Sequence, residues 1–222
     1  MTASRWFSTW ASVGASALAL ACRSRPPVEP PKPPPPAATA EPAPPPPPPP
    51  PKCESLEESC KAAADTVLEL PEAGLSFTPP EGWAYAREPG LTVARFHEGT
   101  ATLALTAAPT DDRKAVVEAV EKLAKRLEIE KLNTQSLRGR LNKADAELES
   151  GKLTIRLWEI DKRRQRGKAP QLKGKGQGTA LVALAPARDG QVVVGVGFVV
   201  NPDPQSLAGA VMKSIQSLRS PP

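Results

Sequence analysis

Short strand patterns followed by one helix pattern make up the first half of the chain beyond residue 66. Val67 to Leu70 and Leu75 to Phe77 are predicted strands around the turn PEAG. Leu91 to Phe96 and Thr100 to Ala107 alternate around HEGT, which predicts a hairpin. The next segment predicts a helix, because Asp111 and Asp112 suit a helix start and apolar residues follow at helical spacing. These apolar residues are Val116, Val117, Val120, Leu123, Ala124 and Leu127.

The second half is richer in strand patterns. Two weakly paired strands are predicted, at Leu132 to Leu141 and Ala144 to Leu148. A clear alternation of apolar and polar residues predicts another strand over Lys152 to Asp161. Thr179 to Ala185 and Gln191 to Val200 predict a hairpin around PARDG.

The last predicted strand carries Gly195 and Gly197 on one face, where glycine permits close approach of a helix. The final helix is expected to start at Asp203 and Pro204. Its apolar positions follow at steps of four, four and three residues: Leu207, Val211, Ile215 and Leu218.

The order of these elements resembles the PsbP-like family over about residues 66 to 219. The resemblance is carried by the turn GLSFTPPEGW, by the middle helix and by the valine-rich strand, NPDP turn and closing helix SIQSLR. The family includes the PsbP subunit of photosystems and the DcrB-type and LpqN-type bacterial lipoproteins. The resemblance implies an α+β fold, an antiparallel sheet with helices packed on both faces, and a non-enzymatic role in binding or assembly. It transfers no ligand residue, because no motif here fixes one.

The N-terminal 22 residues are typical of an export signal. Arg5 supplies a positive charge, Trp6 to Leu20 form an apolar run, and small residues lead to Cys22. This ending resembles a bacterial lipobox, which implies a signal peptide over residues 1–21 and lipid attachment to Cys22. Arg23 follows in place of Asp, so the expected location is the cell envelope, on the outer membrane facing the periplasm.

Two other interpretations of the leader stay open. Leu18 and Leu20 are out of step with the usual lipobox, and Ala19 and Ala21 form an Ala-x-Ala site for ordinary cleavage. A membrane span is the weaker alternative, because the apolar run is shorter than the roughly 20 residues that a spanning helix needs.

Proline dominates the segment after the leader. Pro26 to Pro51 holds 17 of the chain's 28 prolines and no aromatic residue, so it cannot form a core. At roughly 3.1 Å per residue, such a rod reaches on the order of 80 Å. We interpret residues 22–52 as a lipidated cysteine with a spacer and residues 53–222 as one globular domain. A docking ligand for a proline-recognising groove is the alternative for the rod.

The remaining cysteines, Cys53 and Cys60, are expected to form a disulfide in an oxidising compartment. A separation of seven residues is about 10.5 Å along a straight helix, too far for a bridge, so Cys53 must fold back onto a helix that starts near Ser55 or Glu57. Glu54 to Asp65 is predicted as this short polar helix. A redox pair usually has CxxC spacing, and two thiols with a distant His97 do not complete a metal site, so no metal or other cofactor is expected.

Charge adds one feature. The chain has a net charge of +5, or +4 once Arg5 is removed, and seven basic residues without an acid among them follow the strand that ends at Asp161. They are Lys162, Arg163, Arg164, Arg166, Lys168, Lys173 and Lys175. A contact with an anionic polymer or with lipid headgroups is one interpretation of this run, and a long solvated connection is the other. Nucleic acid is disfavoured, because no aromatic residues are interleaved for stacking.

These observations predict a lipid-anchored envelope protein that acts as a non-enzymatic binding or assembly module. Its expected partners are the membrane, through the N-terminal lipid, and another envelope protein or an anionic polymer. The alternative is an exported hydrolase or redox enzyme, although the chain has one histidine and no GxSxG or SxxK motif.

Overall fold

One antiparallel sheet organises the part of the chain that the computed structural model describes, residues 53–56, 60–161, 169–203 and 205–220. The contacts divide the chain into Met1–Pro47 and Pro48–Pro222, and every described residue belongs to the second unit. The predicted leader, Cys22 and most of the basic run therefore lie outside the described residues.

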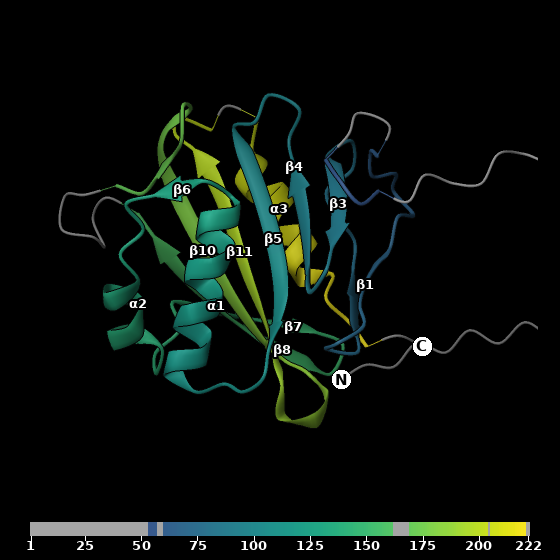
Figure 1. Cartoon of the computed structure of the whole chain (residues 1–222), viewed down its shortest axis with the longest axis vertical. Helices are drawn as coiled ribbons and strands as arrows, with labels where there is room; N and C mark the ends of the chain where they lie inside the picture. Colours follow the sequence, from purple (N-terminus) through teal and green to yellow (C-terminus); the bar gives the residue numbers. More distant parts are fainter. Residues whose placement is uncertain (1–52, 57–59, 162–168, 204, 221–222) are drawn as a thin grey trace, which may run out of the picture. The chain divides into compact units, whose positions relative to one another are not determined.

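The sheet runs in the order β3-β4-β5-β11-β10-β8-β7, and the short strands β6 and β9 pair beside β10 (Figure 1). The strands of this sheet are β3 (Ala84–Glu88), β4 (Leu91–Arg95), β5 (Ala101–Ala108), β6 (Ile129–Glu130), β7 (Ala146–Ser150), β8 (Leu153–Ile160), β9 (Gln171–Leu172), β10 (Gly176–Pro186) and β11 (Val192–Val200). A separate hairpin pairs β1 (Leu68–Leu70) with β2 (Leu75–Phe77). The helices are α1 (Arg113–Arg126), α2 (Thr134–Arg140), α3 (Leu207–Gln216) and the 3-10 turn η1 (Arg188–Gly190). The predicted α+β class with an antiparallel sheet is confirmed.

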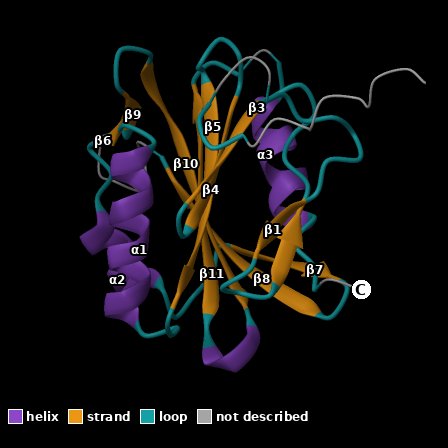
Figure 2. Ribbon diagram, turned by 45° about the vertical axis from the view of Figure 1, so that its right-hand side comes forward, coloured by secondary structure: helices purple, strands orange, loops and turns teal. Residues whose placement is uncertain are grey.

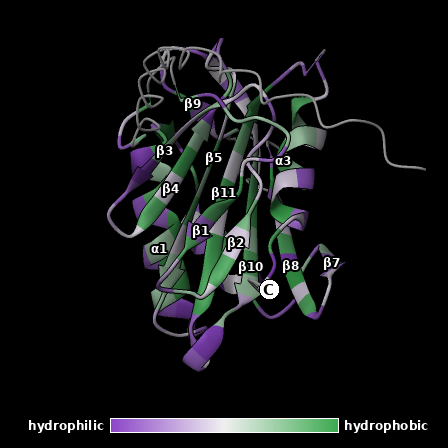
Figure 3. Cartoon of the chain, turned by 90° about the vertical axis from the view of Figure 1, so that its right-hand side faces the viewer, coloured by the Kyte–Doolittle hydropathy of each residue, from purple (hydrophilic) through white to green (hydrophobic). Residues whose placement is uncertain are grey.

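Alternation along the central strands divides the buried side chains into two clusters. Val194 and Val196 of β11 belong to the cluster that contains α1 and α2, whereas Val193 and Val199 belong to the cluster that contains α3, β1 and β2. Figure 2 shows α1 and α2 on one side of the strands and α3 on the other. In Figure 3 the central strands are largely hydrophobic, whereas α1 and α3 carry hydrophobic and hydrophilic residues in turn.

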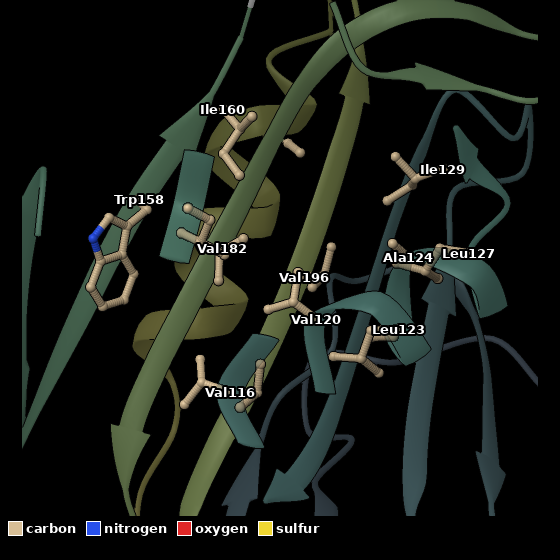
Figure 4. Close-up of a cluster of buried hydrophobic side chains, with 14 of the residues drawn as sticks. Val116, Val120, Leu123, Ala124, Leu127, Ile129, Trp158, Ile160, Val182 and Val196 are labelled. Atoms are coloured by element: carbon tan, nitrogen blue, oxygen red, sulfur yellow. The ribbon is translucent and has the colours of Figure 1, made fainter. Parts of the chain in front are cut away.

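Helix α1 packs as its sequence pattern predicts. Asp112 is its N-cap, and the carboxylate accepts hydrogen bonds from the backbone N–H groups of Lys114 and Ala115. Val116, Val120 and Leu123 of this helix lie over the sheet with Val182 and Val196 (Figure 4). Trp158 joins the same cluster from β8.

Helix α3 lies close to β11 at Gly197. A Cβ atom at this position would lie 2.4 Å from Cγ1 of Val211, so the absence of a side chain sets the contact. The prediction that glycine on this face admits a helix is confirmed. The helix begins at Leu207, later than predicted, and the Asp203 carboxylate accepts from the N–H groups of Leu207 and Ala208.

Two local predictions were wrong. The described part of Glu54 to Asp65 is not helical: it runs along the outer edge of β3, where the Tyr85 N–H donates to the Cys60 carbonyl and the Arg87 N–H to the Cys53 carbonyl. The edge strand needs backbone partners, and this segment supplies them.

The predicted strand Leu132 to Leu141 is largely helix α2. The Asn133 side chain accepts from the Ser136 N–H, which caps the helix, and Leu137 is buried against the α1 cluster. Strand β3 was not predicted. Within the described part of the chain, no helix combines the length and the apolar character needed to cross a membrane.

Candidate functional site

A hollow of about 580 Å³ lies beside the C-terminal turns of α1 and the end of β4. Its charged lining consists of Arg95, Lys122, Lys125, Arg126 and one acid, Glu128. The buried stripe of α1 faces the sheet, so Lys122 and Lys125, which lie off this stripe, are exposed. Arg95 is the last residue of β4, and the sheet places it across from the helix.

Arg126 is neutralised by a carboxylate. Its Nε donates to Oε2 of Glu88 at 2.8 Å, and Nη2 donates to Oε1 of the same residue. This hydrogen bond lowers the pKa of Glu88 below its usual value, although partial burial acts in the opposite direction. The pair ties the end of α1 to β3. The remaining cations, Arg95, Lys122 and Lys125, make no ion pair with any residue of the described segments.

A second hollow of about 490 Å³ continues from the first, because Lys125 and Glu128 line both. Lys173 enters from the segment after β9, held by a hydrogen bond from its backbone N–H to the Glu128 carbonyl at 3.0 Å. We call the surface formed by Arg95, Lys122, Lys125, Arg126 and Lys173 the basic groove.

Two acids that line the second hollow are engaged by neutral partners. Thr134 Oγ1 donates to Glu121 at 2.7 Å, and Gln171 Nε2 donates to Glu130 at 2.7 Å. These bonds hold the carboxylates but leave their negative charge in place. Besides the paired Arg126, the first hollow has three cations against Glu128, whereas the second has three cations against three acids. The first hollow is therefore the more strongly positive part of the groove.

The structure separates the two described residues of the predicted basic run. Lys173 belongs to the basic groove, whereas Nζ of Lys175 donates to the Glu98 carbonyl at 2.9 Å. The other five, Lys162, Arg163, Arg164, Arg166 and Lys168, lie outside the described residues, as does the predicted lipidation site Cys22. The chain enters this undescribed segment after β8 and leaves it just before β9.

Sequence reasoning missed the cations that α1 and β4 contribute. In the sequence Lys122, Lys125 and Arg126 alternate with acids and fit an ordinary solvated helix end, where cations interact favourably with the helix dipole. Arg95 lies 27 positions before Lys122, and only the packing of α1 against the sheet joins them.

The two cysteines and the histidine lie apart from the groove. Cys53 and Cys60 form a disulfide with 5.5 Å between their Cα atoms, at the edge of β3. His97 is exposed in the β4–β5 turn, where its ring lies 4.1 Å from that of Phe96. Among the described residues, no three potential ligands are grouped so that they could hold a metal ion.

The fold and the groove define an α+β protein with a cationic surface at one end of its first helix. No protein-family model matches the chain, and no curated protein matches it. A crystal structure of a protein from Bacteroides thetaiotaomicron VPI-5482 is similar to it at 12% identity and a TM-score of 0.42. The match covers 70% of this chain and 48% of the other, so the chain spans about half the length of that protein.

Proposed function

We propose that the protein is an exported lipoprotein that binds an anionic component of the cell envelope without acting on it chemically. In this proposal lipid on Cys22 anchors the chain, the proline-rich segment 26–51 holds the folded domain away from the membrane, and the domain is PsbP-like. The expected location is the outer membrane, facing the periplasm.

One observation carries the binding role: Arg95, Lys122 and Lys125 share a hollow and have no carboxylate paired to them among the described residues. Bringing like charges together is unfavourable unless an anion compensates for them. A phosphate-bearing headgroup or polymer supplies this compensation, and each cation near an anionic surface contributes roughly 1 kcal/mol. Lys173, the one described residue of the predicted basic run that lines the groove, adds its positive charge to the second hollow.

The groove is tested with a charge-matched pair of triple variants. The first replaces Arg95, Lys122 and Lys125 with glutamine, and the control replaces the exposed cations Arg138, Lys152 and Lys213. Both lose three positive charges, so a difference in binding reports the position of the charge alone. We expect the groove variant to bind phosphatidylglycerol vesicles up to about 100-fold more weakly, and the control to stay close to the wild type.

Polyphosphate serves as a second probe, because it offers the same phosphate chemistry without a membrane. Both probes are used with the chain from residue 23 on, which lacks the acyl anchor and contains every described residue. Equal losses in the two triple variants would show that only net charge matters, and the groove would be abandoned as the binding site. Replacing the seven basic residues of the run with serine extends the same assay to the undescribed segment.

The anchor is tested separately in cells. Cys22→Ser is expected to release the folded domain from the membrane fraction, because two acyl signals hold a protein far more firmly than one polar contact. A Cys22→Ser variant that still sediments with membranes after a high-salt wash, which screens the contact of the groove with anionic lipid, would refute lipid anchoring while leaving the groove experiment intact.

A further inference from the structure

A cavity of about 280 Å³ lies on the α3 side of the sheet, between the β1–β2 turn and the β3–β4 hairpin. Leu70 and Ala107 of the α3-side cluster give it an apolar lining, Leu91 of the α1-side cluster borders it at the start of β4, and Thr92 also lines it. Cross-strand pairing places Thr92 opposite Leu105, a residue of the α3-side cluster, so the threonine side chain is directed to the cavity side. Of these lining residues, Leu91 alone also lines the first hollow of the basic groove.

Thr92 is the exception among the buried polar residues of the described chain. Thr102 donates to the Ala94 carbonyl, Thr106 to the Gly90 carbonyl, Ser76 to the Arg219 carbonyl and Ser214 to the Thr78 carbonyl. Thr92 is only 3% exposed, and its hydroxyl has no hydrogen bond to any described residue. The hydroxyl oxygen is not among the fully buried side-chain atoms without a partner, which in the described chain are Nη1 of Arg140 and Oε1 of Gln191, so its small accessible surface opens on the cavity and can bond to a group that enters there.

The mouth of the cavity is acidic. Glu69 and Glu72 line it, are exposed and form no ion pair within the described segments. An oxygen of the Glu72 carboxylate lies 3.7 Å from the place that a Cβ on Gly90 would take, so this carboxylate reaches the opposite hairpin. Arg87 also lines the cavity, and its guanidinium donates to the Val67 carbonyl at 3.2 Å, which holds the group but leaves its positive charge in place. The lining therefore carries Glu69 and Glu72 against Arg87, with Glu88 paired to Arg126.

We propose that this cavity binds a small amphiphilic amine, with a neutral hydrogen-bonding group against Thr92, a short apolar chain in the cavity and the cationic end at Glu72 and Glu69. The arrangement suits such a ligand because its polar group can bond to a hydroxyl, its chain contacts apolar side chains, and its charged end lies near carboxylates at the solvated mouth. This inference does not depend on the basic groove or on the lipid anchor.

The test uses 5-amino-1-pentanol, with pentylamine and 1-pentanol as comparison probes that each lack one polar end. Amide chemical shifts of Leu91, Thr92 and Ala107 report binding by the chain from residue 23 on. We expect a saturable response to the amino alcohol and about tenfold weaker binding of each comparison probe. Thr92→Val should reduce the amino alcohol to the affinity of pentylamine, and Glu72→Gln should reduce it to that of 1-pentanol.

Two controls distinguish a ligand site from a general charge effect and from a buried water. Glu81→Gln removes an exposed carboxylate that does not line the cavity and should leave the affinity of the amino alcohol unchanged. Thr92→Val should also leave the urea midpoint of the free protein unchanged or raised, because its hydroxyl has no protein partner to lose. The proposal would be overturned if all three probes bound equally or if none gave a saturable response. It would also be overturned if Thr92→Val destabilised the protein, because the hydroxyl would then hold only water.

Discussion

Gly197→Ala should push helix α3 away from β11, and the effect can be isolated within one strand. The new Cβ would lie 2.4 Å from Cγ1 of Val211, a separation that folded proteins do not tolerate. Val211 is 1% exposed and β-branched, so its methyl group has little freedom to rotate away. Gly195→Ala is the matched control, because its Cβ would lie an ordinary 3.4 Å from Cβ of Ala183 on the same face.

The magnitude follows from two opposing contributions. Overpacking of a filled core costs about 1–3 kcal/mol. Replacing glycine with alanine lowers the entropy of the unfolded chain, which stabilises both variants by about 0.4–1 kcal/mol. The contribution of the unfolded chain cancels in the comparison. Gly197→Ala should therefore unfold with a free energy about 2 kcal/mol below that of Gly195→Ala, which corresponds to roughly 4–8 °C in Tm.

Urea unfolding followed by circular dichroism measures the difference, and a third substitution identifies its cause. Val211→Ala removes the atom that the new Cβ would strike, so the penalty at Gly197 should largely disappear in that background. Identical urea midpoints for the two alanine variants would refute the close helix contact. A penalty that is unchanged in the Val211→Ala background would show that Val211 is not its cause.

The remaining predictions concern the two connections to β3. Because the pKa of Glu88 is lowered in the folded protein, its ion pair with Arg126 stabilises the fold above the ordinary glutamate pKa, and this stabilisation is lost as the pH falls through the lowered value. At neutral pH the free energy of unfolding of the wild type should exceed that of the Glu88→Gln variant by about 1 kcal/mol. The urea midpoints of the two proteins should converge in acid, and midpoints that stay apart there would contradict the prediction. Replacing Cys53 and Cys60 with serine should lower the free energy of unfolding by about 2.5 kcal/mol and speed hydrogen exchange at the Arg87 amide. Unchanged exchange would mean that the disulfide does not hold the edge segment.

Local periodicity was enough to predict the elements that bury one regular face. The stripe from Val116 to Leu127 predicts α1, and alternation from Val192 to Val200 predicts β11 together with the glycine face that receives α3. These patterns are reliable because the spacing of the side chains is itself a consequence of helix or strand geometry.

Elements that depend on a distant partner could not be predicted in this way. The sequence AYARE of β3 has little apolar alternation, and it is a strand because β4 and the segment around Cys60 supply its hydrogen bonds. Helix α2 is short and polar, and its one fully buried residue, Leu137, packs into the cluster that α1 forms.

Both proposed sites belong to the second category. The sequence by itself determined most of the sheet, and it predicts an export signal and a proline-rich spacer, since each of these patterns is formed by neighbouring residues. Only the tertiary structure brought Arg95 to the cations of α1 and placed the unpartnered Thr92 hydroxyl under the β1–β2 turn. A binding surface collects residues from strands and helices that are distant in the sequence, and packing of the core decides which of them meet.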